Sequence, residues 1–170
     1  LNIFKFNKVG INVMNLTKSL IKFSLLSLVA MSSATLWAGE KIDKTLTAQA
    51  DGRVNIDVMT GLVTVKSWDK NEVKVVGELD DQAKGYQFES LGNRVLFRVE
   101  MPEQRWGNWK DSSAALTFYV PKQSDLRFEG VNVSIDVEGI TGSSRINTVN
   151  GDITALGLNK RINLETVNGK

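Results

Sequence analysis

The sequence has 170 residues, of which 42% are hydrophobic, enough for one domain with a packed core. It contains no His and no Cys, which excludes disulfides and thiol nucleophiles and removes the commonest general base and soft metal ligands. Any catalysis would therefore depend on carboxylates, hydroxyls, Lys or Arg. The 14 Gly and only 2 Pro favour a chain with many tight turns.

The N-terminal residues follow the order of a secretory signal peptide. Met14 is followed by Lys18 and Lys22, then by an apolar run over residues 23–31 and by small and polar residues over 32–38. The apolar run is too short for a stable membrane anchor. We therefore predict an export signal, with an uncleaved anchor or a buried core helix as the alternative.

This pattern divides the chain into three segments. Residues 1–13 precede the first Met and are interpreted as translated upstream sequence. Residues 14–38 are the predicted signal peptide, cleaved after Ala38 or, as a second choice, after Ala34. Residues 39–170 are predicted to form a single exported β domain, truncated at its C-terminus, in the periplasm or at the cell surface.

The charge of the chain is unevenly distributed about this cleavage site. Four of the 21 basic residues precede it and none of the 19 acidic residues does, so the mature chain is slightly acidic. Nucleic-acid binding needs a concentrated positive face and is not expected. No membrane span is expected in the mature chain, and the lack of Cys excludes a lipid anchor at the cleavage site.

Apolar and polar residues alternate through most of the chain after Thr45, which predicts β-strands. The expected core faces are Val54, Ile56 and Val58; Val63 and Val65; Val95, Phe97, Val99 and Met101; Leu116, Phe118 and Val120; and Val131, Val133, Ile135 and Val137. Turn signals lie at Asp51-Gly52, Thr60-Gly61, Lys84-Gly85, Gly92-Asn93, Asn150-Gly151 and Asn168-Gly169. No mature segment keeps a period of 3.6, so the fold class is predicted to be all-β.

The C-terminal part contains a repeat of 18 residues. The dipeptide Val-Asn recurs at 131–132, 149–150 and 167–168, and the tetrapeptide Thr-Val-Asn-Gly recurs at 148–151 and 166–169. The apolar residues Phe128, Ile146 and Leu164 keep the same period. A shared period in apolar, Asn and Gly positions indicates a repeat architecture rather than chance alternation.

We interpret this repeat as a β-solenoid or β-helix-like stack of short strands with rungs of about 18 residues, preceded by a more irregular antiparallel β region. In such a stack Asn132, Asn150 and Asn168 would form a ladder of amide hydrogen bonds. The alternative is a series of ordinary hairpins with Asn-Gly turns, which do not require a common period. The third rung stops at Lys170, which is why we expect a truncated domain.

Two segments of the chain resemble a widespread bacterial family known as putative adhesins. The first is residues 61–77, GLVTVKSWDKNEVKVVG, in which a strand, a Trp-Asp turn and a second strand follow one another. The second begins GITG at residue 139 and continues to TVNGDI at 148–153. The resemblance covers residues 51–170 and implies an exported, β-solenoid-like envelope domain. It implies no mechanism and no active-site residues.

The most prominent candidate for ligand binding is the segment between two predicted strands at residues 104–111. It contains Arg105, Trp106, Trp109 and Lys110, which suit stacking and hydrogen bonding to a sugar or a peptide. The alternative is that both indoles pack against the end of the sheet.

Two further polar clusters have structural interpretations that we favour. Trp68, Asp69 and Asn71 are typical of a tight turn with a packed indole. Asp80 and Asp81, with Glu78 and Glu89 nearby, lack the spacing of a calcium loop and are predicted to form a solvated turn. We therefore expect no metal ion and no cofactor.

No catalytic residues are predicted. Asp136 and Asp152, the nearest pair of carboxylates for polysaccharide cleavage, lie in different phases of the repeat. The predicted function is a non-enzymatic exported cell-envelope β-repeat protein, an adhesin or binding scaffold, whose partner is an unidentified envelope protein or glycan. The alternative is a carbohydrate-active β-helix protein of the polysaccharide lyase or hydrolase kind, and a weaker third is a cation-binding envelope module.

Overall fold

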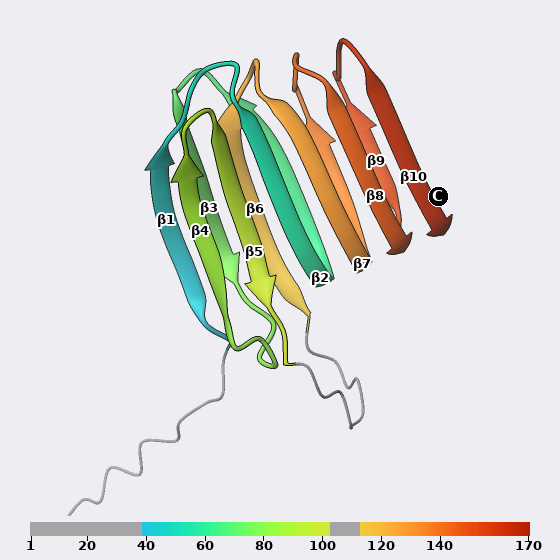
Figure 1. Cartoon of the computed structure of the whole chain (residues 1–170). Helices are drawn as coiled ribbons and strands as arrows, with labels where there is room; N and C mark the ends of the chain where they lie inside the picture. The colour runs from blue at the N-terminus through green and yellow to red at the C-terminus, as the bar shows by residue number, and fades with distance from the viewer. Residues whose placement is uncertain (1–38, 103–112) are drawn as a thin grey trace, which may run out of the picture. The chain divides into compact units, whose positions relative to one another are not determined.

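The computed structural model describes residues 39–102 and 113–170, which form one mixed sheet of ten strands (Figure 1). The all-β prediction is confirmed, and in these two segments no helix is long and apolar enough to cross a membrane. The strands are β1 (Lys41–Thr47), β2 (Arg53–Trp68), β3 (Glu72–Glu78), β4 (Gly85–Leu91), β5 (Arg94–Glu100), β6 (Ala114–Pro121), β7 (Asp125–Glu138), β8 (Ser144–Asn150), β9 (Ile153–Leu156) and β10 (Ile162–Asn168).

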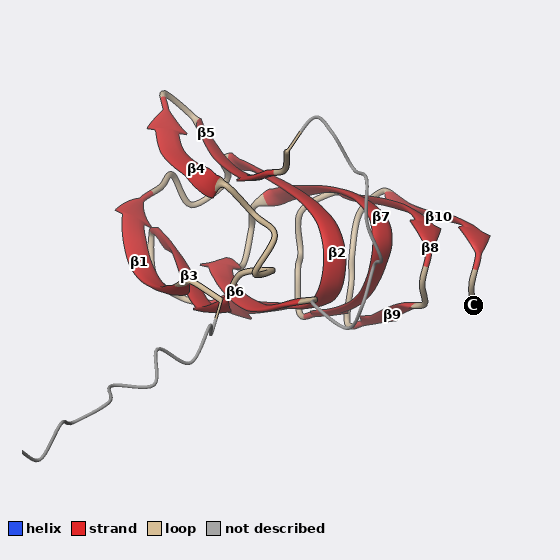
Figure 2. Ribbon diagram, turned by 90° about the horizontal axis from the view of Figure 1, so that it is seen from below, coloured by secondary structure: helices blue, strands red, loops and turns tan. Residues whose placement is uncertain are grey.

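The sheet is folded over so that its strands form two layers with the core between them (Figure 2). The long strands β2 and β7 bend in the middle and belong to both layers. The first half of β2 pairs with β5 and its second half with β6, while the first half of β7 pairs with β8 and its second half with β9. Strand β4 extends the first layer beyond β5, and β3 and β1 extend the second beyond β6.

The bend in β2 lies at Thr60 and Gly61. Val58 and Thr60 face the core before the bend and Val63 faces it afterwards, so the inward-facing positions shift by one residue. Gly61 has φ 123°, and a Cβ there would lie 2.0 Å from the carbonyl oxygen of Ala114. We predicted a turn between two strands here. The backbone instead stays paired with β7 on both sides of the bend, so the strand is continuous.

Strand β7 bends at the equivalent place. Phe128 and Val133 are both fully buried although they are five residues apart, an odd step that an unbent strand does not allow. Val131 lies in the bend and is only half-buried. The prediction that Val131 shares a core face with Val133 was therefore wrong, because the strand changes layers between them.

The N-terminal part of the sheet is mixed rather than antiparallel. Pairs β1–β3, β3–β6 and β4–β5 are antiparallel as predicted, but β2 pairs in parallel with β5, β6 and β7. Parallel neighbours require the chain to return to the same end of the sheet. Such long returns are not visible in local alternation, which explains why an antiparallel region was predicted from the sequence.

The C-terminal part pairs in parallel with an offset of 18 residues. Phe128 lies opposite Ile146, and Ile146 lies opposite Leu164. In the second layer Ile135 lies opposite Ile153 with the same offset. Residues that share a phase of the sequence repeat therefore lie beside one another on adjacent strands.

Aromatic rings fill the middle of the core. The ring of Phe97 meets that of Phe118 edge-on at 5.0 Å, which joins the two layers. Tyr86 and Phe88 of β4 pack on the other side of Phe97, at 5.6 and 5.9 Å. Burial then falls towards β10, where Leu164 is 41% exposed although Ile146 beside it is fully buried.

We expect the two members of this apolar column to differ in their contribution to stability. Ile146→Ala removes a fully buried side chain and should lower the free energy of unfolding by about 2–5 kcal/mol. Leu164→Ala removes a side chain that is 41% exposed and should cost about 1 kcal/mol or less. Urea unfolding followed by circular dichroism measures both values. Equal losses would contradict the packing described here.

Candidate ligand-binding face

The outer corner between the two layers carries a row of amide side chains. The Nδ2 group of Asn150 donates a hydrogen bond of 2.7 Å to Oδ1 of Asn132, and Asn168 donates one of 2.8 Å to Oδ1 of Asn150. Thr60 of β2 lies opposite Asn132 in the pairing, but its side chain faces the core, so the row begins at Asn132. The three Asn residues are solvent-exposed.

The residues next to each Asn explain the repeated Thr-Val-Asn-Gly sequence. The hydroxyls of Thr148 and Thr166 donate hydrogen bonds of 3.0 Å to the carbonyl oxygens of Val133 and Gly151 on the neighbouring rung. At Gly151 a Cβ would lie 2.1 Å from the carbonyl oxygen of Val133, so only Gly permits this approach. Thr, Asn and Gly thus each make a different contact to the adjacent rung.

The position of an Asn in the row should determine what its removal costs. Asn150→Ala removes two side-chain hydrogen bonds and Asn168→Ala removes one. Because the row is exposed, each lost bond should cost about 0.5–1 kcal/mol, the lower part of the range for hydrogen bonds. In thermal unfolding, the melting temperature of Asn150→Ala should therefore be lower than that of Asn168→Ala. The reverse order would show that the amide bonds do not contribute to stability.

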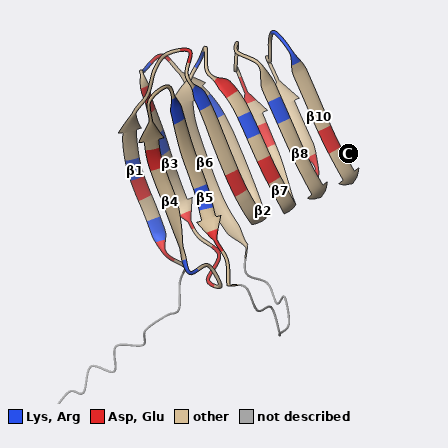
Figure 3. Ribbon diagram, in the orientation of Figure 1, with Lys and Arg blue, Asp and Glu red and all other residues tan. Residues whose placement is uncertain are grey.

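A hollow in the described surface lies where strands β2, β7, β8 and β10 begin. It has a volume of about 590 Å³. We call it the cationic groove because its lining contains five cationic side chains and one carboxylate: Arg53, Arg127, Arg145, Lys160, Arg161 and Asp125. Figure 3 shows the basic segments of β7, of β8 and of the turn before β10 near this end of the strands.

Strand pairing places the groove residues in rows across the first layer. Arg127 and Arg145 lie opposite one another on β7 and β8, and Asn163 follows on β10. Arg53 of β2 lies opposite Asp125 of β7. Strand neighbours are about 4.8 Å apart, so adjacent cations are held at close and regular intervals.

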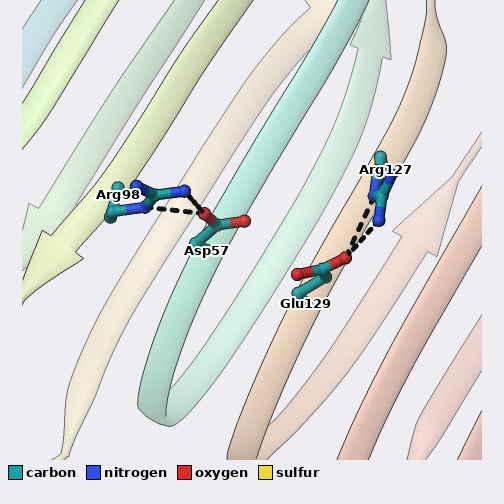
Figure 4. A network of polar contacts seen from close by, with 4 residues as sticks. All are labelled: Asp57, Arg98, Arg127 and Glu129. Carbon is teal, nitrogen blue, oxygen red and sulfur yellow. Dashed lines mark hydrogen bonds and ion pairs between the residues drawn. The ribbon is translucent and has the colours of Figure 1, made fainter.

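Most of these cations form no ion pair with the described residues. Arg127 is paired with Glu129 at 2.6 Å, and next to this pair Arg98 binds Asp57 at 2.7 Å (Figure 4). By contrast, within residues 39–102 and 113–170 no ion pair is formed by Arg53, Arg145, Lys160 or Arg161. The groove therefore presents positive charge that the described part of the protein does not neutralise.

The single carboxylate of the groove has a structural contact. Oδ1 of Asp125 accepts a hydrogen bond of 2.8 Å from the backbone N–H of Ser143, which ties the beginning of β7 to the segment before β8. No residue of the groove was predicted from the sequence to bind a ligand. A usable indication was present, because Arg127 and Arg145 occupy the same phase of the 18-residue repeat.

Of the candidates from the sequence, Arg105, Trp106, Trp109 and Lys110 lie outside the described residues. Their binding role stays a prediction.

The turn at Trp68 is packed as we predicted. The indole Nε1 donates a hydrogen bond of 2.7 Å to the carbonyl oxygen of Glu72, and its ring lies 5.5 Å from that of Tyr119. The ammonium of Lys70 lies 4.8 Å from the centre of the indole. These contacts account for the Trp without a ligand.

The prediction of a solvated turn was wrong for Asp80. This side chain is 4% exposed, and its carboxylate accepts hydrogen bonds from the Thr60 hydroxyl and from the backbone N–H of Gln82. It thereby fixes the bend in β2 from the inside. Across the described ranges no group of acidic side chains has the arrangement of a metal site.

The two carboxylates considered for catalysis serve different parts of the fold. Asp136 lies within β7 opposite Thr154 of β9. Asp152 lies in the turn between β8 and β9, where its Oδ1 accepts a hydrogen bond of 2.8 Å from the backbone N–H of Lys170. The structure therefore does not place them in register as a pair.

Comparison with known proteins finds similarity only among solved structures. No protein-family model matches the sequence, and no curated protein does. The structural neighbours are bacterial proteins described as putative adhesins or cell adhesion proteins, the class that the sequence resembles. A putative cell adhesion protein from Clostridium sporogenes is 10% identical with a TM-score of 0.47, and the match covers 76% of this chain and 97% of that one. A putative adhesin from Bacteroides fragilis is 8% identical with a TM-score of 0.32, covering 77% and 97%.

Proposed function

We propose that this chain is a non-enzymatic exported protein of the cell envelope, an adhesin or binding scaffold whose outer strand face carries a ligand. The observation that carries the proposal is the cationic groove. Its residues lie in or directly before four strands, of which β2, β7 and β8 are paired on both sides and β10 on one, so the site is held by the backbone of the sheet. A preformed open groove suits the binding of an extended partner.

We further propose that β7 to β10 are the beginning of a β-solenoid. Support comes from the parallel pairing at an offset of 18 residues and from the Asn side chains joined across three successive strands. In repeat proteins of this kind each rung contacts only its neighbours, and equivalent outer positions form an extended surface. The cationic groove lies across equivalent outer positions of this kind, such as Arg127 and Arg145 on neighbouring strands.

Export is inferred from the sequence of residues 14–38 and can be tested directly. Expressed from Met14 in a Gram-negative host, the protein should be recovered outside the cytoplasm with Gly39 as its first residue, or Thr35 if cleavage follows Ala34. Mass spectrometry of the purified product identifies the new terminus. The double variant Leu26→Arg, Val29→Arg interrupts the apolar run and should remain unprocessed. Processing of this variant would show that the run is not an export signal.

A carbohydrate-active enzyme is the second candidate, and one observation favours it. Asp125 is a carboxylate among cations, an arrangement that polysaccharide lyases can use to remove a proton next to a uronate. Against it, one oxygen of Asp125 already accepts a backbone hydrogen bond. The groove also lacks the second carboxylate that a glycoside hydrolase requires.

We expect no cleavage of polygalacturonate by the purified protein. Lyase action would be detected as the absorbance of unsaturated uronate and hydrolysis as new reducing ends. Activity that is lost in Asp125→Asn would establish the enzyme and exclude the non-enzymatic proposal. Asp136→Asn and Asp152→Asn are the corresponding tests of the two carboxylates considered from the sequence.

A further inference from the structure

We infer that the cationic groove binds a linear acidic polysaccharide across the strands. The inference rests on the proposed function, since it names the ligand of the same face. It begins from charge: Arg53, Arg145, Lys160 and Arg161 have no ionic partner among residues 39–102 and 113–170, although the mature chain as a whole is slightly acidic. Five cations beside one carboxylate leave a net positive cluster that repels itself, and an anionic ligand relieves that repulsion.

The arrangement of the cations favours a polymer over a small anion. Arg53 lies on β2, Arg145 on β8 and Arg161 directly before β10, with β7 and its paired Arg127 between the first two, so the cations extend across the layer rather than around one point. Neighbouring strands are about 4.8 Å apart, so the strands that carry Arg53 and Arg145 are two spacings apart and those of Arg145 and Arg161 one. One spacing is comparable to the length of one sugar residue in an extended polysaccharide, so acidic groups along the polymer can meet cations on different strands.

The chemistry of the lining favours an acidic sugar over other polyanions. Guanidinium groups bind carboxylates and sulfates through two parallel hydrogen bonds. Ser143 and Asn163 add hydrogen-bonding groups that suit sugar hydroxyls. Among the described residues that line the groove none is aromatic, so they offer no platform on which proteins stack the bases of single-stranded nucleic acids.

The turn that carries two of the cations has a strained backbone. Lys160 has φ 54°, the left-handed region that favours Gly, and within the described segments no other non-Gly residue has positive φ. Its N–H donates a hydrogen bond of 2.7 Å to Oδ1 of Asn159, which stabilises this conformation. Strained residues of this kind often occur at binding sites. Here the strain keeps a cation at the edge of the groove where Gly would suit the backbone better.

The inference is tested by measuring affinity for polygalacturonate, with a neutral galactan and a single-stranded DNA of similar length as comparisons. The protein should bind polygalacturonate, bind it more weakly as salt is raised, and not bind the galactan. Arg145→Gln and Arg161→Gln should each weaken binding about tenfold. Lys160→Gly should also weaken it while leaving the melting temperature unchanged or higher, because Gly accepts this φ.

Lys74→Gln is the matched control, because it makes the same change of charge at a Lys paired with Asp43 in the other layer. It should retain binding. Equal binding of the neutral polymer, tighter binding of DNA, or unchanged affinity in folded groove variants would each overturn the inference. If the exported protein still adheres to whole cells when both Arg are replaced, the scaffold function stands and only this ligand assignment fails.

Discussion

The C-terminal part of the structure, which carries the groove, depends on the parallel alignment of neighbouring strands at a constant offset of 18 residues. This alignment places side chains of the same kind beside one another on adjacent strands. Phe128, Ile146 and Leu164 therefore form an apolar column, and the three Asn residues are joined by hydrogen bonds between their amides. It has an electrostatic cost as well, because like charges directly opposite one another on adjacent strands are destabilising. Arg127 beside Arg145 is such a pair, and Glu129 neutralises only Arg127.

The bends in β2 and β7 turn a single sheet into a two-layered body. At each bend the inward-facing positions shift by one residue, so the same strand supplies core side chains to both layers. Asp80 holds the bend of β2 from the inside, whereas the Asn row holds the following rungs from the outside. A buried carboxylate without such partners would be costly, and Thr60 and Gln82 satisfy it. The groove is therefore built on a backbone that is fixed at its corners.

The sequence allowed the strands and the repeat to be predicted, but not the pairing order or the groove. Alternation identified the core faces of β2, β5 and β6, since every second residue of a half-buried strand faces the core. Val131 and Thr60-Gly61 were misread because a bend inverts the alternation without ending the strand. The groove was missed because net charge was averaged over the chain. Its cations come from segments far apart in sequence, and only the pairing of Arg53 with the beginning of β7 brings them together.

The position of β2 at the centre of the sheet also has a consequence for folding. Its neighbours β5, β6 and β7 all follow it in the chain with other strands between, so its contacts close long loops and are entropically expensive to form early. The rungs from β8 onward close only short loops onto a strand that is already in place. The described sheet thus combines a slowly formed, cooperative centre with C-terminal strands that can open one at a time, so the resistance to local opening decreases from β2 towards β10.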